Sequence, residues 1–501
     1  MSNPLHTFVV SDLHLTEAEP VDPKRPLWKR YKHADLSIDR TFARWLERIR
    51  HDALAGATGP VDLELVLAGD IFDFDSVMAM PDDPPWPVHW LERRRGLDPE
   101  QDKSRFKMEV ILRDHPEWIA ALGRFVLEGG RVVFLIGNHD LELYWPAVQR
   151  QVRAALDLPE AHDAAVRFCE WFYVSQDTLI EHGNQYDAYC MCIDPLSPCV
   201  ERRGRTVVRL PFGNVAGKLM LNGMGLFNPH VESSFVMTFR GYLRFFYKYL
   251  IRIQPLLAWT WLWGAAATLV RSLSDGLRPA LRDPLTFVER VDAIGQRANS
   301  SGTVALALQQ LHAHPAIFSP FKILRELWLD RALLLIGLLY VTFQAALVLN
   351  AIVPIPILWA FPIWVLLSPI LIFYGQSVQS DVYAMQKAAF LKIPTAAKIA
   401  GVTRVIHGHT HREVHTTVEG IEHLNGGTWS PAYADPECTQ SVGRKGFIWL
   451  APVAGRDHRE ATLYAWIDPD YTTLSGDESV RKARWSLLPR PADTSTGRAS
   501  A

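Results

Sequence analysis

The chain has 501 residues, a length that favours two or three structural units over a single core. Its 52 basic and 54 acidic side chains nearly cancel, to a formal net charge of -2. This balance argues against a uniformly basic surface that binds nucleic acid. Five cysteines in so long a chain do not form a disulfide framework. Cys190, Cys192 and Cys199 lie close enough to suggest a metal site, but their spacing matches no standard zinc pattern, so reduced cytosolic thiols are the simpler interpretation.

Five short apolar runs, each followed by polar residues, recur along the chain and indicate buried strands. They span residues 5–10, 63–68, 131–136, 178–180 and 402–406. Helices are expected between the early strands, at 38–49 and 118–127. Strands that alternate with helices predict an α/β fold in which ligands gather at the strand ends.

Two segments interrupt this order. Residues 76–117 form an excursion that contains Pro and Trp and predicts either a lid or an inert surface loop. Residues 205–400 are too long for a loop of a compact domain, so we expect a helical insertion. The catalytic domain is then expected in two parts, 1–204 and 401–470, followed by a polar tail at 471–501.

Within the insertion, the run from Ala332 to Tyr374 contains no Asp, Glu, Lys, Arg or His. It is long enough for two membrane-crossing helices of about 20 residues each, with a turn at Val353–Pro356. Two crossings would leave the motifs before and after the run on one side of the membrane. The alternatives are a re-entrant hairpin and a buried helical hairpin of a soluble protein. Basic residues flank the run and favour a cytoplasmic position for both flanks: Lys322, Arg325, Arg331, Lys387 and Lys392.

A basic series precedes this run. Arg240, Arg244, Lys248 and Arg252 recur every four residues with aromatic residues between them. This spacing predicts an amphipathic helix suited to an anionic membrane surface, and the alternative is a solvated helix face with a buried reverse side. The apolar stretch 253–270 follows, and its role is open because one further crossing would break the even number of crossings.

The five apolar runs are followed by motifs rich in metal-binding side chains. These motifs are Asp12-Leu13-His14, Gly69-Asp70-Ile71-Phe72-Asp73, Gly137-Asn138-His139-Asp140, His182-Gly183-Asn184 and Gly408-His409-Thr410-His411. The two-residue period of a strand would place Asp12 beside His14 and His409 beside His411. Carboxylate, amide and imidazole ligands together suit Mn, Fe or Zn. Each motif alone is a weak signal, but all five in this order are not expected by chance.

On these motifs the sequence resembles the calcineurin-like metallophosphoesterase superfamily, and the resemblance covers residues 5 to about 220 and 400 to about 470. The resemblance implies a sandwich of two sheets flanked by helices and a centre of two divalent metal ions, manganese before iron or zinc. It implies that one ion is held by Asp12, His14, Asp70 and His411, and the other by Asp70, Asn138, His182 and His409. It also implies catalysis by His139, an orienting role for Asp140, and supporting positions for Asp73 and His407.

The phrases Ser11–Leu15 and His407–Arg412 are similar to motifs of the UDP-2,3-diacylglucosamine pyrophosphatases, although His139, Asn184 and Glu413 depart from that pattern. We therefore expect a membrane-associated phosphohydrolase or phosphodiesterase that acts on a lipid-linked or nucleotide-linked phosphoester or pyrophosphate. No cleavable signal is visible at the N-terminus, so the catalytic domain is expected on the cytoplasmic face of the inner membrane. The alternatives are a nuclease of the same superfamily and a non-catalytic, membrane-anchored binding module.

Overall fold

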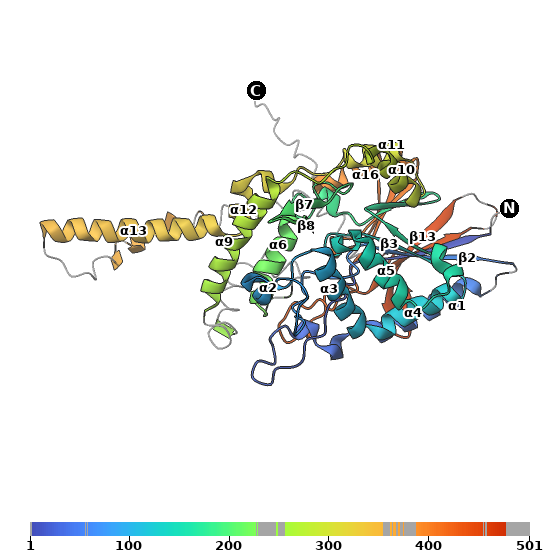
Figure 1. Ribbon diagram of the computed structural model, residues 1–501, viewed down its shortest axis with the longest axis horizontal. Coiled ribbons are helices and arrows are strands. Elements are labelled where there is room, and N and C mark those ends of the chain that lie inside the picture. Colours follow the sequence, from blue (N-terminus) through green and yellow to red (C-terminus); the bar gives the residue numbers. More distant parts are fainter. Residues whose placement is uncertain are drawn as a thin grey trace, which may run out of the picture.

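The computed structural model describes residues 3–476 except 56, 58, 227, 229–246, 249–255, 354–360, 363, 367–368, 371–373, 375–386, 454 and 456–457. The described part is a mixed α/β fold built on two multi-stranded sheets, with one long helix that projects from the body (Figure 1). The strands expected from the apolar runs are present, and each ends within a few residues of its motif.

The larger sheet has seven strands in the order β14-β13-β12-β1-β2-β3-β4. Four of them run parallel to one another: β1 (Leu5–Val10), β2 (Asp62–Ala68), β3 (Gly130–Leu135) and β4 (Val166–Cys169). Three antiparallel strands complete the sheet from the C-terminal part of the chain: β12 (Gly446–Pro452), β13 (Arg459–Ile467) and β14 (Asp470–Thr473). The first three motifs therefore lie at the same edge of this sheet.

The second sheet has five strands in the order β10-β11-β9-β6-β5. Their bounds are β5 (Phe172–Ser175), β6 (Thr178–Glu181), β9 (Arg404–His407), β10 (Glu413–Val418) and β11 (Ile421–Gly426). Strand β9 pairs in parallel with β6, although more than 200 residues separate them in the chain. This pairing brings the fourth and fifth motifs to the same edge, because parallel strands share their carboxyl ends.

The two sheets pack face to face. Val9, Val66 and Val133 of the larger sheet form one buried cluster with Ile180 and Ile406 of the smaller sheet. The alternate residues of the larger sheet point outward against helices α1 (Asp39–Leu54), α4 (Pro116–Leu127) and α5 (Pro146–Ala155). The strands therefore have an apolar residue on both faces, which explains the nearly continuous apolar runs in the sequence.

The smaller sheet is covered on its outer face by α10 (Phe287–Arg297), α11 (Gly302–Gln309) and α16 (Ile393–Ala400). All three helices come from residues 205–400, for which the sequence predicted a separate helical unit. Ile294, Leu308 and Ala397 pack into one cluster with Leu179 and Val405 of the sheet. Residues 205–400 therefore do not form one separate unit, because three of their helices belong to the sandwich and the others lie beside it.

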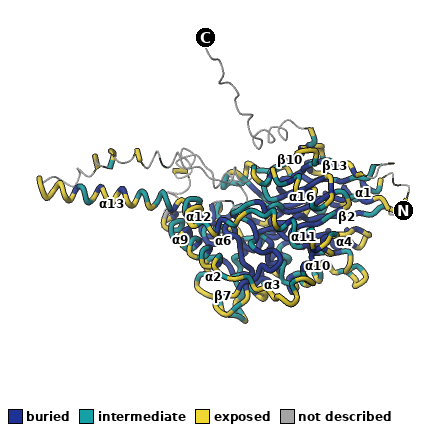
Figure 2. Tube along the Cα trace, turned by 90° about the horizontal axis from the view of Figure 1, so that it is seen from above, coloured by how far each residue is buried: buried dark blue, intermediate teal, exposed yellow. Residues whose placement is uncertain are grey.

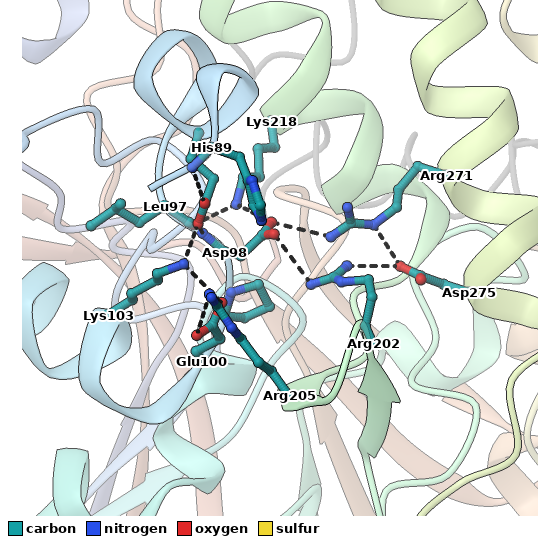
Figure 3. A network of polar contacts seen from close by, with 12 residues as sticks. His89, Leu97, Asp98, Glu100, Lys103, Arg202, Arg205, Lys218, Arg271 and Asp275 are labelled. Carbon is teal, nitrogen blue, oxygen red and sulfur yellow. Dashed lines mark hydrogen bonds and ion pairs between the residues drawn. The ribbon is translucent and has the colours of Figure 1, made fainter. Parts of the chain in front are cut away.

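The excursion 76–117 is a packed part of the molecule, so it is not the inert surface loop that was one of the two alternatives from the sequence. It contains α2 (Trp90–Arg95) and α3 (Gln101–Asp114). Between these helices, the carboxylate of Asp98 lies 3.1 Å from Arg271, 3.5 Å from Lys218 and 3.5 Å from Arg202 (Figure 3). Asp275 joins the two arginines, at 2.8 Å and 3.2 Å. These ion pairs tie the excursion to three other elements: the β7–β8 hairpin (Cys199–Arg202 and Arg205–Val208), α6 (Phe212–Leu219) and α9 (Leu257–Gly276).

Helix α13 (Leu329–Ile352) follows α12 (Pro320–Glu326) and stands away from the body (Figures 1 and 2). Among the described residues it is the helix that is long and apolar enough to cross a membrane, with a mean hydropathy of 2.3 and only 17% of its most apolar stretch buried. Tyr374 donates a hydrogen bond to Asp330 at 2.8 Å, so the chain returns to the base of α13.

Other parts of the expected membrane region lie wholly or partly outside the described residues. These are the turn around Pro354, most of the returning half of the hairpin, and the basic series except Lys248. Lys248 donates to Glu437 at 2.9 Å. The apolar stretch 253–270 falls mainly in α9, which packs against Tyr189 and Phe212 through its inner face. Helix α9 therefore has packing partners in the body of the protein, whereas α13 is largely exposed.

Candidate metal centre

The five motifs lie in loops that follow the five strands, and backbone hydrogen bonds join the loops. The N–H of Asp12 donates to the carbonyl oxygen of Gly69 at 3.0 Å, and the N–H of His14 donates to that of Asp70 at the same distance. The N–H of Gly408 donates to the carbonyl oxygen of His182 at 2.8 Å. These bonds join two of the three motif loops of the larger sheet and both motif loops of the smaller sheet, and the packing of the sheets brings the two sets together.

Five of the candidate ligands have a left-handed backbone. The φ angles are 56° at Asp12, 51° at His14, 52° at Asp70, 67° at His409 and 54° at His411. Residues with a β-carbon rarely adopt such angles, and each costs about 1 kcal/mol or more. Asp12 lies beside His14, and His409 beside His411, as expected, but strand periodicity is not the cause. The strands end before these residues, and the left-handed backbone at each of them turns both side chains of a pair inward.

Glycines in the motifs permit the close approach of the loops. A β-carbon at Gly137 would lie 2.3 Å from Oδ1 of Asp70, and one at Gly69 would lie 2.5 Å from the ring of His182. Gly69 also has a φ of 86°, which favours glycine. The Gly-Asp and Gly-Asn pairs of the sequence therefore reflect steric demands at the site.

Asp12, His14 and His411 form a first group. Nε2 of His14 lies 3.2 Å from Nε2 of His411, which in turn lies 3.2 Å from Oδ1 of Asp12. Two nitrogens bound at about 2.1 Å to one tetrahedral ion lie roughly 3.4 Å apart. The spacing of this group therefore suits a shared cation.

Asp70, His182 and His409 form a second group. Nε2 of His182 lies 3.1 Å from Oδ2 of Asp70, while Nδ1 of His182 bonds to the carbonyl oxygen of Ala68 at 2.9 Å. That bond fixes the ring so that Nε2 faces the carboxylate. The same Oδ2 of Asp70 lies 4.0 Å from Nε2 of His14. Asp70 thus stands between the two groups, as a bridging ligand must.

The residues fit a divalent cation, because buried ligand atoms lack the hydrogen bonds of ordinary polar groups. Oδ1 of Asn138 has none, and Oδ1 of Asp12 and Nε2 of His182 have only the ion-pair contacts with His411 and Asp70 given above. Buried polar groups are nearly always hydrogen-bonded, and an orphaned one destabilises the fold. Cations between the two groups would give each of these atoms a partner. The structure therefore contains buried His and Asp clusters that could hold metal ions.

His139 lies at the edge of the first group, and its contacts differ from those expected. Its Nδ1 lies 3.2 Å from Oδ1 of Asp73 and 3.9 Å from Oδ2 of Asp75. Both carboxylate oxygens of Asp140 instead accept from backbone N–H groups, those of Ile71 at 2.9 Å and Gly137 at 2.5 Å. The expectation that Asp140 orients His139 is therefore corrected: Asp73 is the contact of His139, and Asp140 holds two motif loops together.

The carboxylates set the protonation of the imidazoles around them. Burial lowers the pKa of His139, but Asp73 and Asp70 outweigh it and raise that pKa to about 10. Burial likewise opposes the effect of Asp70 on His182, whose pKa is raised to about 9. Burial, reinforced by Asp70, raises the pKa of Asp140 to about 7. The cluster therefore concentrates negative charge and attracts positive charge.

The structure adds supporting residues that the motifs did not indicate. Oδ2 of Asp187 lies 3.1 Å from Nε2 of His409 and fixes that ring, as carboxylates beside metal-binding histidines do. Asn214, from α6, bonds to Asn138. His407, for which the resemblance implied a supporting position, has Nε2 3.4 Å from Glu181, which is not one of the candidate ligands. Cys190 lies with Asp187 and His409, and the five cysteines form no disulfides.

Comparison of the chain with protein-family models and with curated proteins finds no match. The fold and the clustered His and Asp residues therefore carry the functional argument.

A cavity of about 460 Å³ adjoins this site. His14 lines it, together with Tyr31, Lys32, Ile38 and His115.

Proposed function

We propose that the protein is a dinuclear metal-dependent hydrolase of phosphoric esters or anhydrides with the metallophosphoesterase fold. More specifically, we propose a membrane-associated phosphohydrolase or phosphodiesterase that acts on a lipid-linked or nucleotide-linked phosphoester or pyrophosphate. The observation that carries the proposal is the convergence of seven candidate ligands from five strand ends. These are Asp12, His14, Asp70, Asn138, His182, His409 and His411.

The chemistry follows from the donor set. Two divalent cations, Mn²⁺ by preference and Fe or Zn as alternatives, would neutralise phosphoryl oxygens and make a water nucleophilic near neutral pH. Asp70 would bind both ions, and the two flanking groups would bind one each. The carboxylates of Asp73 and Asp70 hold His139 in its imidazolium form, which carries a proton on each ring nitrogen and would donate one to the leaving oxygen. No side-chain nucleophile is required.

The cavity beside His14 supports a substrate with an organic part of substantial size. Its volume of about 460 Å³ lies in the range of small-molecule sites. Its lining combines the apolar Leu36 and Ile38 with the polar Tyr31 and Lys32. We place the non-phosphoryl part of the substrate there.

Helix α13 supports membrane attachment. Its 24 residues rise roughly 36 Å at 1.5 Å per residue, which exceeds the roughly 30 Å hydrocarbon core of a bilayer. Large apolar side chains on it are exposed, among them Leu339, Tyr340 and Phe343. The contact between Tyr374 and Asp330 supports a hairpin whose two ends lie on one side. We propose that this side is the cytoplasmic face of the inner membrane.

A substrate screen with defined metal content tests the function. Full-length protein is purified in detergent, stripped with chelator and reloaded with Mn²⁺. It is then assayed on p-nitrophenyl phosphate, bis-p-nitrophenyl phosphate, UDP-diacylglucosamine and single-stranded DNA. We expect Mn²⁺-dependent hydrolysis of phosphoesters or of the lipid diphosphate. Preferential cleavage of DNA would indicate a nuclease, and no hydrolysis by metal-loaded protein would indicate a binding module.

A further inference from the structure

Asn214 connects the inserted segment to the metal cluster. It lies on α6, is fully buried, and contacts residues that follow two different strands. Its Nδ2 donates to Oδ2 of Asp75 at 2.7 Å and to the backbone carbonyl oxygen of Asn138 at 2.9 Å. Its Oδ1 lies 3.3 Å from Nδ2 of Asn138.

The donor and acceptor roles in these hydrogen bonds determine whether the amide oxygen or the amide nitrogen of Asn138 faces the metal cluster. A backbone carbonyl only accepts hydrogen bonds, so the atom of Asn214 beside it must be the donor Nδ2. The remaining atom of Asn214, Oδ1, only accepts and therefore requires the donor Nδ2 of Asn138. Oδ1 of Asn138 is then turned away from Asn214, and it is the buried oxygen that has no hydrogen bond.

We propose that Asn214 is a positioning residue that holds Asn138 with its amide oxygen, and not its amide nitrogen, toward the metal ion shared by Asp70, His182 and His409. This inference rests on the proposed function, because it assumes a metal there. An amide nitrogen has no lone pair suited to a cation, so a reversed Asn138 would not bind the ion. The first helix of the inserted segment thereby sets the affinity of one metal site.

Replacement of Asn214 by leucine removes the orienting bonds at similar side-chain size. Partners of metal ligands typically contribute 10- to 100-fold to affinity, so we expect Asn214→Leu to weaken one Mn²⁺ site by about that factor and to spare the other. Asn222→Leu is the matched control. Asn222 is also buried and lies eight residues further on, but it donates to the carbonyl oxygens of Asp75 and Arg95.

A second variant separates orientation from general packing. In Asn138→Asp, either oxygen of the side chain can bind a cation, so no amide has to be oriented. Adding Asn214→Leu to this background should change Mn²⁺ affinity by less than about twofold, because the two effects depend on one interaction. A purely structural role of Asn214 predicts the same loss in both backgrounds.

The measurement is calorimetric titration of Mn²⁺ into chelator-stripped, full-length protein, with far-UV circular dichroism to verify folding. We expect two sites in the wild type and in Asn222→Leu, one of them weakened in Asn214→Leu, and little further loss in the double variant. Wild-type affinity in Asn214→Leu, or equal losses in both backgrounds, would overturn the inference and leave the proposed function intact. A wild-type protein that binds no Mn²⁺ would overturn the proposed function and this inference together.

Discussion

Replacement of Asp98 by asparagine should destabilise the fold by roughly 2 to 5 kcal/mol at neutral pH. Burial raises the pKa of Asp98, but Lys218 and Arg271 outweigh it and lower that pKa to about 2. Relative to the ordinary value of 3.8, this shift corresponds to roughly 2 kcal/mol. The upper end of the range applies because Lys218, Arg271 and Arg202 would all lose a partner in a largely buried network.

The pH dependence has a defined sign. Because the pKa of Asp98 is lower in the folded protein than in the unfolded chain, its contribution is complete above about pH 5. It is lost progressively as the pH falls through about 4 to 2. The difference in unfolding free energy between the wild type and Asp98→Asn should therefore be constant from about pH 5 to 8 and shrink in stronger acid.

Urea unfolding followed by tryptophan fluorescence measures this difference. Asp102→Asn is the matched control, because Asp102 lies at the start of α3, is 65% exposed, and is 4.0 Å from Arg105. An exposed pair of this kind contributes at most about 1 kcal/mol, so the control should unfold almost as the wild type does. Equal unfolding midpoints for Asp98→Asn and Asp102→Asn would refute the reasoning that this network joins the excursion to the inserted segment.

Three further predictions concern the metal centre and the membrane. Asp70→Ala should reduce activity to near background and lower the metal content measured by ICP-MS, and wild-type turnover in this variant would contradict the two-metal assignment. His139→Ala should lower turnover by roughly 10² to 10⁴ at unchanged metal content, and loss of a metal would make His139 a ligand. Alkaline carbonate should leave the protein in the membrane pellet. A cysteine at Pro354, in a background without the native cysteines, should react with an impermeant maleimide outside spheroplasts, and one at Ser380 only after lysis. Labelling of both only after lysis would favour a re-entrant or soluble segment.

Much of the sandwich could be predicted from the sequence because its strands are buried on both faces. A strand such as Leu63–Ala68 is apolar at nearly every position and ends in polar residues, which is a strong local signal. The candidate ligands share this signal, since each motif directly follows such a run. The grouping of Asp12 with His411 came from the family resemblance alone, because the two residues follow strands of different sheets and only the packing of the sheets brings them together.

The remaining features depend on contacts between distant parts of the chain. Asp187 and Asn214 lie outside the five motifs, and only the packing of the loop after β6 and of α6 brings them to His409 and Asn138. The orienting role of Asp140 was implied by the resemblance, but both of its carboxylate oxygens accept from backbone N–H groups, and Asp73 contacts His139. The sequence did not indicate that α10, α11 and α16 cover the smaller sheet, because the apolar pattern of an amphipathic helix does not specify the surface on which the helix packs.

The left-handed backbone at Asp12, Asp70 and His411 lowers the stability of the fold, while the proposed activity requires the side chains at these positions. Glycine adopts these φ angles without strain, so Asp12→Gly or His411→Gly would relieve the backbone while it removes a candidate ligand. In the metal-free protein, His411→Gly should melt at a higher temperature than the wild type, whereas Asp12→Gly also loses the hydrogen bond that Oδ2 of Asp12 accepts from the N–H of His409. We expect both variants to be inactive. Stability alone would therefore favour glycine at these positions, whereas the proposed metal centre requires their side chains.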